Sequence, residues 1–257
     1  MEQQRYNKTK FRMYEWKETS EEDAQNIAFE LVERLFSEMA NQSVKLDSNE
    51  YGICDMPYLY SERRLDSVIM PALSKICNGL VHDEVSAERH NNSRKAARKK
   101  SQGRYDYWCI YKDYSFVIEV KQNFDGYIRN KTVKKATNEL WKEMIIQLKT
   151  VKDDMKYYIE KTKKIIRLGI MFVTSYTDNP PCKENLLQFN ERIPKISSLY
   201  FDGLGTNIQI PRPDMMMLWQ IPDKIALKKH HIYRGTFPGL WAIVKVFDPM
   251  EHQGATK

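Results

Sequence analysis

The chain has 257 residues, of which 42% are hydrophobic and 12% aromatic, and this composition excludes an intrinsically disordered protein. Its 41 basic and 34 acidic side chains give a formal net charge of +7, which favours a polyanionic partner such as nucleic acid without requiring one. No apolar run is long enough to cross a bilayer, and the four cysteines are widely spaced without a C-x-x-C pair, which argues against a zinc site or a disulfide framework.

A single domain is expected over residues 20–247, preceded by an N-terminal extension of residues 1–19 and followed by a tail of residues 248–257. The extension is polar and is expected to be loosely held. It has no apolar region of the kind found in a signal peptide, so the sequence predicts a cytoplasmic protein with reduced cysteines and no membrane contact. A homodimer is left open.

Two packing helices are predicted in the first third of the chain. The first follows Thr19 or Ser20, either of which is a typical N-cap, and ends near residue 41. The second begins at Ser61 and carries Glu62 and Asp66 one turn apart. The apolar stripes that predict them are Ile27, Leu31, Leu35 and Met39 in the first, and Leu65, Val68 or Ile69, Leu73 and Ile76 in the second.

A basic segment follows the second helix. Residues 82–90 fit a strand, and residues 89–104 then hold seven lysines and arginines and no acid. Such a run is often a solvated loop. Because it directly precedes an aspartate-bearing strand, it is also suited to holding a phosphate backbone. The residues expected to make this contact are Arg94, Lys95, Arg98, Lys99, Lys100 and Arg104.

Residues 104–122 predict a β-hairpin. The second strand includes the run FVIEV, in which four of five residues are β-branched or aromatic, so a buried strand is expected. The presence of a carboxylate inside such a strand requires an explanation. Alternate side chains of a strand point to opposite faces, so Glu119 and Lys121 share one face.

The register of this hairpin depends on its turn. A two-residue turn at residues 112–113 would set Asp106 opposite Glu119, whereas a turn at residues 113–114 would set Asp106 opposite Lys121. In both registers Asp106, Glu119 and Lys121 lie on one face, within reach of one another.

Two carboxylates on one face of a half-buried sheet repel each other, and Lys121 neutralises only one of them. A divalent cation held by hard oxygen ligands, Mg²⁺ or Mn²⁺, would remove the repulsion and leave the lysine available for chemistry. The alternative is a structural hairpin with a solvated glutamate–lysine pair.

The motif formed by Asp106, twelve intervening residues and Glu119-Val120-Lys121 resembles that of the PD-(D/E)XK nuclease superfamily. Tyr105 stands where the motif has proline. The resemblance covers about residues 58–175. It implies an α/β protein with the restriction-endonuclease-like fold, a mixed β-sheet core flanked by helices, here with extra N- and C-terminal elements.

The resemblance also implies roles for the motif residues. Asp106, Glu119 and the main-chain carbonyl of Val120 would hold one or two Mg²⁺ (or Mn²⁺) ions. Lys121 would orient or help deprotonate the attacking water, or donate to the developing oxyanion.

Helices on either side of the hairpin are implied to contribute further polar residues. Glu62 on the preceding helix and Gln147 on the following one match best, and Glu84 and Glu88 are further candidates. Each has a simpler explanation as well. An acid in a first helical turn is stabilised by the helix dipole, and a glutamine at the edge of an apolar stripe can bond to backbone or solvent.

The remaining elements are predicted from their periodicity. A loop is expected over residues 123–130, and a long helix from about residue 131 with an apolar stripe that continues to Ile159. A buried strand follows at residues 165–174. Beyond it, the sequence predicts a helix at residues 183–192 and strands at residues 215–221 and 240–247.

The function expected from this sequence is that of a metal-dependent nuclease, a hydrolase of phosphodiester bonds in nucleic acid, with DNA favoured over RNA. The alternative is a non-catalytic nucleic-acid-binding or assembly protein that retains the nuclease fold. Cutting at ends and internal cutting are both left open.

Overall fold

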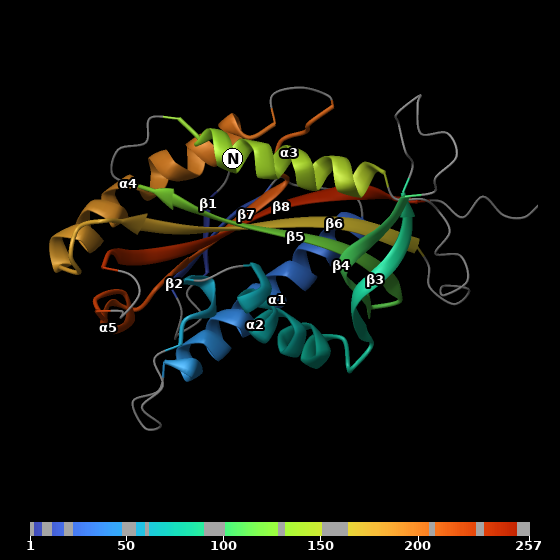
Figure 1. The fold of residues 1–257 in the computed structure, drawn as a ribbon, viewed down its shortest axis with the longest axis horizontal. Coiled ribbons are helices and arrows are strands. Elements are labelled where there is room, and N and C mark those ends of the chain that lie inside the picture. The colour runs from blue at the N-terminus through green and yellow to red at the C-terminus, as the bar shows by residue number, and fades with distance from the viewer. Residues whose placement is uncertain are drawn as a thin grey trace, which may run out of the picture.

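The computed structural model describes residues 3–6, 12–17, 23–47, 55–59, 62–89, 101–127, 132–150, 164–205, 209–229 and 234–250. In this part of the chain, helices cover both faces of one mixed β-sheet, so the protein is an α/β protein as the sequence predicted (Figure 1). Among the helices of these ranges, none combines the length and the apolar composition needed to cross a membrane.

Eight strands within the described residues form the sheet, in the spatial order β1-β2-β7-β8-β6-β5-β4-β3. The pairing of β5 with β6 is parallel, and the other neighbouring pairs are antiparallel. The strands are β1 (Gln3–Tyr6), β2 (Arg12–Lys17), β3 (Val81–Arg89), β4 (Ser101–Tyr111), β5 (Tyr114–Gly126), β6 (Lys164–Thr177), β7 (Met215–Gln220) and β8 (Thr236–Met250).

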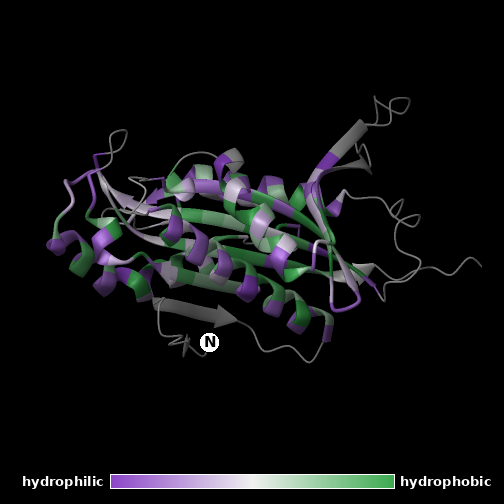
Figure 2. Ribbon diagram, turned by 90° about the horizontal axis from the view of Figure 1, so that it is seen from below, coloured by the Kyte–Doolittle hydropathy of each residue, from purple (hydrophilic) through white to green (hydrophobic). Residues whose placement is uncertain are grey.

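The helices form two layers. They are α1 (Asp23–Leu46), the 3₁₀ turn η1 (Pro57–Leu59), α2 (Glu62–Ile76), α3 (Lys135–Lys149), α4 (Lys183–Gly203) and the short α5 (Asp223–Ala226). The first apolar core joins α1, η1 and α2 to one face of the sheet, and the second joins α3 and α4 to the other. Figure 2 looks onto the α1–α2 layer, where hydrophilic residues mark the outer sides of the helices and the central strands behind them are largely hydrophobic.

Strand β5 contributes to both layers because its side chains alternate between the faces. Phe116, Ile118 and Val120 belong to the core under α1 and α2. Glu119 and Lys121 therefore face the α3 layer. The strand is buried over its first eight residues, as expected for a strand that has sheet neighbours on both sides and helices on both faces.

Gly169 of β6 allows α3 to lie close to this part of the sheet. It is the register partner of Glu119. A Cβ atom at this position would come within 2.9 Å of Leu148 Cδ1 and Met144 Cε, both on α3. The absence of a side chain therefore sets the distance between α3 and the strand pair that carries Glu119.

Most of the predicted elements are confirmed. Helix α2 buries Leu65, Val68, Ile69 and Leu73, and the strand predicted at residues 82–90 is β3. The hairpin, the buried strand after it and the strands near residues 215 and 240 correspond to β4, β5, β6, β7 and β8. Helix α3 runs over Lys135–Lys149, whereas residues 151–163, on which its predicted continuation fell, lie outside the described residues.

The loop predicted over residues 123–130 is wrong for its first half, because β5 continues through Gly126. The polar side chains in this part of the strand have partners inside the fold. Asn123 Nδ2 donates to Thr137 Oγ1 at 2.8 Å, and Asp125 accepts a hydrogen bond from the Tyr200 hydroxyl at 3.2 Å. Strand β6 supplies a parallel partner for every residue from Tyr114 to Gly126, so the backbone stays extended.

Further boundaries differ from the prediction. Strand β8 spans Thr236–Met250 rather than residues 240–247, because it pairs with β6 at both ends, so residues 248–250 belong to the strand and not to the predicted tail. Helix α3 begins at Lys135 rather than near residue 131. Helix α1 ends at Leu46 rather than near residue 41, since Ser43 is buried and Leu46 packs on the core. Helix α4 continues past Pro194 to Gly203, because Ile196, Tyr200 and Phe201 lie in the second core. Residues 3–6 and 12–17, expected to be loosely held, form strands β1 and β2, and β2 pairs along its full length with β7.

Candidate active site

The hairpin turn consists of Lys112 and Asp113. Both have positive φ, 47° and 65°, and the residues on either side, Tyr111 and Tyr114, are a register pair. Positive φ at both central positions is the property of a type I′ turn, the connection whose twist suits a two-residue hairpin. Of the two registers left open by the sequence, the structure therefore has the one that brings Asp106 level with Glu119.

The pairing of β4 with β5 stops one position before that level. The last register pair is Tyr107 with Ile118. Beyond it, Oδ2 of Asp106 accepts a hydrogen bond of 2.6 Å from the main-chain N–H of Val120. The Asp106 carboxylate thus accepts the hydrogen bond of a β5 main-chain N–H at the point where the backbone pairing of the two strands ends.

This hydrogen bond also indicates where the Val120 carbonyl points. In a strand, the N–H and C=O of one residue face the same neighbouring strand. Since the N–H of Val120 reaches Asp106 on β4, its carbonyl oxygen faces β4 as well. Two oxygen groups, the Asp106 carboxylate and the Val120 carbonyl, therefore face the same gap at the end of the β4–β5 ladder.

Glu119 and Lys121 form a buried ion pair beside this gap. Lys121 Nζ lies 3.1 Å from Oε1 of Glu119. Glu119 is 2% exposed and Lys121 8% exposed, whereas Asp106 is half-buried. An ion pair with so little solvent is costly to assemble and strongly interacting once formed. Asp106 is the member of the group that is most open to solvent.

The donor set fits a hard divalent cation. Mg²⁺ is typically held by one or two carboxylates together with waters and substrate oxygens, rather than by a complete cage of protein ligands. The carboxylates of Asp106 and Glu119 and the Val120 carbonyl are oxygen donors of this kind. In the described part of the chain, no group of three or more His, Cys, Asp and Glu side chains is arranged to hold a metal ion.

Helix α2 begins at Glu62, but the Glu62 side chain lies outside the described residues. Two contacts locate the segment around it. Gln122 Nε2 donates to the Tyr58 carbonyl at 2.9 Å, and the Tyr107 hydroxyl donates to Asp66 Oδ1. These bonds hold the start of α2 against β4 and β5 near the end of their ladder. The helix packs on the sheet face opposite Glu119, and a role for Glu62 in the site stays a prediction.

Gln147 lies on the flank of α3 that faces β5 and β4. The other flank is fixed by Trp141 Nε1 and Lys149 Nζ, which donate to the carbonyls of Pro211 and Gln209 at 3.1 and 2.7 Å. Gln147 is half-buried, and its Oε1 is buried with no hydrogen-bond partner within the described residues. A buried amide oxygen in this situation is costly unless water or a ligand satisfies it.

The other acids considered in the sequence are less suited to a metal site. Glu84 is exposed, has φ of 45° and pairs with Arg104 at 2.7 Å. Both side chains are largely in solvent, so this ion pair contributes little stability. The Glu88 side chain lies outside the described residues. So do Arg94, Lys95, Arg98, Lys99 and Lys100, and the expected phosphate contact of these five residues stays a prediction.

Polar residues continue along the same face of β5 beyond Lys121, and the sequence prediction missed them. Asn123 bonds to α3, and Asp125, 4% exposed, is held by Tyr200 and by Lys134, whose Nζ lies 3.4 Å from Asp125 Oδ1. Burial and the neighbouring carboxylate raise the pKa of the Tyr200 hydroxyl well above its usual value. The alternation of Glu119, Lys121, Asn123 and Asp125 was a signal of one polar face.

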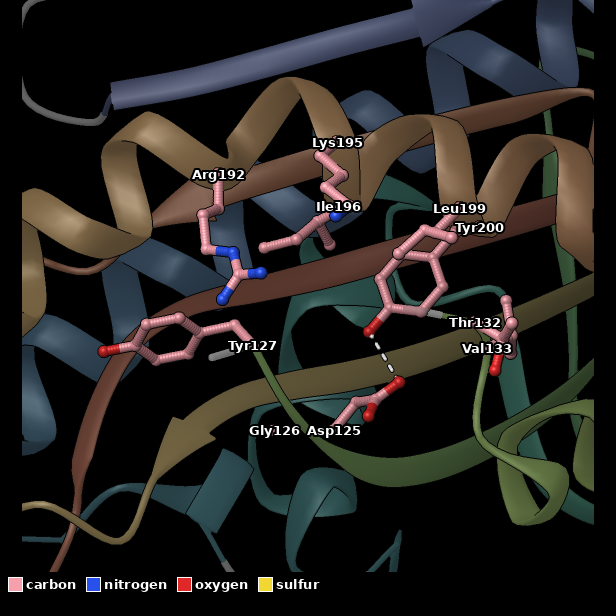
Figure 3. A pocket seen from close by; sticks show the side chains of 10 residues that line it. All are labelled: Asp125, Gly126, Tyr127, Thr132, Val133, Arg192, Lys195, Ile196, Leu199 and Tyr200. Carbon is pink, nitrogen blue, oxygen red and sulfur yellow. Dashed lines mark hydrogen bonds between the residues drawn. The ribbon is translucent and has the colours of Figure 1, made fainter. Parts of the chain in front are cut away.

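A small cavity adjoins Asp125 at the far end of β5. Its volume is about 20 Å³, enough for one water molecule. Figure 3 shows Arg192 and Tyr200 extending from α4 towards this end of the strand, with the Tyr200–Asp125 hydrogen bond between the layers. The Tyr200–Asp125 hydrogen bond holds α4 against β5.

Comparisons with protein-family models, with curated proteins and with solved structures found no match to this chain.

Proposed function

We propose that the protein is a metal-dependent nuclease that hydrolyses phosphodiester bonds, with Asp106, Glu119 and Lys121 at its active site. The observation that carries this proposal is the hydrogen bond from Val120 to Asp106, which brings the Asp106 carboxylate beside the Glu119–Lys121 ion pair where the β4–β5 ladder ends. The two carboxylates and the ammonium share one sheet face, and together with the Val120 carbonyl, which points along the sheet towards β4, they combine oxygen ligands with a proton-bearing group.

Asp106, Glu119 and the Val120 carbonyl would hold the cation, Mg²⁺ or Mn²⁺. When bound, such an ion lowers the pKa of coordinated water and stabilises the charge that develops on phosphate. Asp106 suits this role because the Val120 N–H fixes one of its oxygens and its half-buried position keeps it accessible from solvent. Glu119 suits it because its position on a central, buried strand fixes its backbone.

Lys121 acts on the attacking water or on the phosphate. Its ammonium, at 3.1 Å from Glu119, is held beside the carboxylates and is shielded from bulk solvent. In this position the ammonium orients the water and, through its positive charge, favours the loss of the water's proton to solvent, or it donates to a non-bridging phosphate oxygen as negative charge builds there. Gln147, whose buried Oε1 has no hydrogen-bond partner within the described residues, is a candidate for a further polar contact with substrate or water.

The order of the elements supports a restriction-endonuclease-like core. A helix, an antiparallel hairpin, a second helix and a strand parallel to the second hairpin strand occur in this order as α2, β4 with β5, α3 and β6, with β3 lying between α2 and β4. This is the order of elements in the fold that the sequence motif resembles. Strand β3 on one edge and strands β1, β2, β7 and β8 on the other are additions around that core.

Nucleic acid is the proposed substrate, with DNA favoured over RNA, and the basic residues between β3 and β4 are the proposed backbone contact. The test uses end-labelled single- and double-stranded DNA and RNA of one sequence, incubated with the protein in Mg²⁺ and in chelator. Degradation that needs Mg²⁺ and is lost in an Asp106→Asn variant supports the proposal. Mg²⁺-independent retention in a gel without degradation of any substrate would indicate a binding protein and would overturn it.

A further inference from the structure

We propose that His82 and Trp108 form a stacking site for an unpaired base of the nucleic acid, close to Asp106. The inference rests on the proposed nuclease function and deepens it, because it names the part of the substrate that the protein binds in addition to the phosphate. The substrate would then present an unpaired base next to the bond that is cut.

The rings of His82 and Trp108 are stacked across the edge of the sheet. The two residues are register partners on β3 and β4. Their ring centroids are 5.7 Å apart and their planes differ by 28°. Stacked rings at this separation are offset, so neither ring covers the other completely. Because His82 is exposed and Trp108 is only half-buried, aromatic surface remains open to solvent at this edge.

Trp108 lies on the same face of the sheet as the candidate active site. The residues on either side of it in β4 belong to the core on the opposite face. Its register partner on β5 is Val117, which shares a face with Glu119. Trp108 and Asp106 are two residues apart on one strand face, a separation of about 7 Å. A base on the aromatic pair and a phosphate at Asp106 would therefore belong to the same or to adjacent nucleotides.

The aromatic pair lies where the β3–β4 pairing is still regular, next to the point where it is interrupted. The register includes each position from Val81 to Asp83 and resumes at Val85, so it skips Glu84 and its counterpart Asp106. Glu84 has φ of 45°, a left-handed conformation that a glutamate adopts at a cost. Both ladders of β4 thus lapse at Asp106. The rings, in contrast, are positioned by paired strands, and such a rigid support suits a binding surface.

The indole N–H of Trp108 lacks an acceptor in the part of the chain that the structure describes. Its Nε1 is buried there and makes no hydrogen bond. A buried indole N–H usually has a partner, and leaving it unsatisfied costs free energy. The amide oxygen of Gln147, on the helix that covers this face, is in the same situation. The polar groups of a nucleotide, or water held with it, would satisfy both.

An unpaired base fits this surface better than a paired one. In a duplex, both faces of a base are covered by its stacked neighbours. A base in a single strand, or at an opened position of a duplex, has a face that can stack on an aromatic side chain. Such stacking accepts any base, because every base has a π-face. A contact that only joins β3 to β4 is the competing explanation, and it gives no reason for open aromatic surface beside Asp106.

Two ligands separate stacking from backbone contact. One is a short fluorescent single strand of thymidines. The other has the same length, label and phosphates but an abasic residue at every position, so it cannot stack wherever it is bound. Binding of both to the full-length protein is measured in chelator, so that no cleavage is needed for a result. The ratio of the two Kd values then reports the contribution of the bases.

Three variants of the pair and one control are compared with the wild type. Trp108→Leu and His82→Ala each remove one ring, whereas Trp108→Phe keeps an aromatic ring at its position. The control is Tyr176→Leu, which removes a ring from a comparable stacked pair. Tyr176 and Phe237 have centroids 6.5 Å apart and planes 29° apart, and they lie at the far end of β5.

The wild type is expected to bind the thymidine strand more tightly than the abasic strand. Trp108→Leu and His82→Ala should weaken binding of the thymidine strand by about 5- to 150-fold, the value of one base–aromatic stack. Neither variant should change binding of the abasic strand by a similar factor. Trp108→Phe should keep most of the wild-type ratio, and the Tyr176→Leu control should keep all of it.

An unchanged Kd ratio in His82→Ala and Trp108→Leu would overturn the inference, and so would equal binding of the two ligands by the wild type. Because His82 is exposed on an edge strand, its variant gives a result even if Trp108→Leu does not fold. Equal weakening of both ligands would show that the pair is only structural. A changed oligomeric state with an unchanged ratio would assign the pair to a second copy of the chain, which also overturns the inference.

These outcomes are separate from the proposed activity. Base-dependent binding that requires His82 and Trp108, without Mg²⁺-dependent cleavage, leaves the stacking site standing and refutes the nuclease. Mg²⁺-dependent cleavage with the same Kd ratio in the wild type and the ring variants does the reverse.

Discussion

The main-chain N–H of Val120 donates a 2.6 Å hydrogen bond to Oδ2 of Asp106, across the point where the backbone ladder between β4 and β5 ends. The bond joins the two strands by a side chain where they are no longer joined by their backbones. It gives Asp106 a structural contact in addition to its proposed catalytic one, and conservative substitutions can separate the two.

Asp106→Asn should keep this contact, because the amide oxygen can still accept from Val120, whereas Asp106→Ala removes the acceptor. We expect Asn to change the free energy of unfolding by less than about 1 kcal/mol and Ala to lower it by about 1–3 kcal/mol, the cost of leaving a donor unsatisfied. Urea denaturation of the three proteins measures the difference. Equal stability of the two variants would show that the contact contributes nothing.

Lys121→Met should destabilise the fold, because it removes the ammonium beside a carboxylate that is only 2% exposed. Losing one partner of a buried pair costs about 3–5 kcal/mol. The double variant Glu119→Gln with Lys121→Met should recover much of this loss, since the buried charge is removed together with its partner. Thermal or urea unfolding of the wild type, the single variants and the double variant measures the free energies of this double-mutant cycle. A single variant as stable as the wild type would contradict the burial of this pair.

Divalent cation should stabilise the wild type and not the site variants. A ligand that binds only the folded state adds about 2.7 kcal/mol at one hundred times its Kd. The melting temperature of the wild type should therefore rise with Mg²⁺ or Mn²⁺, and the rise should be absent in Asp106→Asn and in Glu119→Gln. The same rise in all three proteins would locate the bound cation elsewhere.

Stability at alkaline pH should depend on Tyr200. Its folded-state pKa is raised by burial and by Asp125, so the tyrosine contributes stability that is fully present below the unfolded pKa of about 10 and is lost as the pH rises through the folded pKa. Tyr200→Phe removes the titrating group. From about pH 8 to about pH 11 the wild type should lose more of its unfolding free energy than the variant. Parallel curves would contradict this role for Tyr200.

The hairpin and its charged face could be predicted because they follow from the period of a strand. The choice of register could not. Lys112 and Asp113 lack the glycine or asparagine that marks a type I′ turn. The turn is instead fastened to α1, where Glu30 accepts hydrogen bonds from Lys112 and, at 2.7 Å, from the Tyr111 hydroxyl. A contact between residues so far apart in the sequence gives no local signal.

The errors in element boundaries have the same origin. The loop predicted over residues 123–130 is instead partly strand, because α3, Lys134 and Tyr200 satisfy the polar side chains of Asn123 and Asp125 inside the fold. The helix predicted at residues 183–192 continues past Pro194, because apolar residues beyond the proline reach the second core. The lapse of both β4 ladders at Asp106 depends on three strands and could not be inferred from any one of them.

The most direct measurement is the single-turnover rate of hydrolysis of a labelled DNA duplex by the wild type, Asp106→Asn, Glu119→Gln and Lys121→Met. Each is compared in Mg²⁺ and in chelator, and Tyr200→Phe serves as a control outside the site. The nuclease proposal predicts Mg²⁺-dependent hydrolysis by the wild type and the control, with a loss of at least about 100-fold in each site variant that remains folded by circular dichroism. Hydrolysis that is equally fast in Asp106→Asn and the wild type would contradict it.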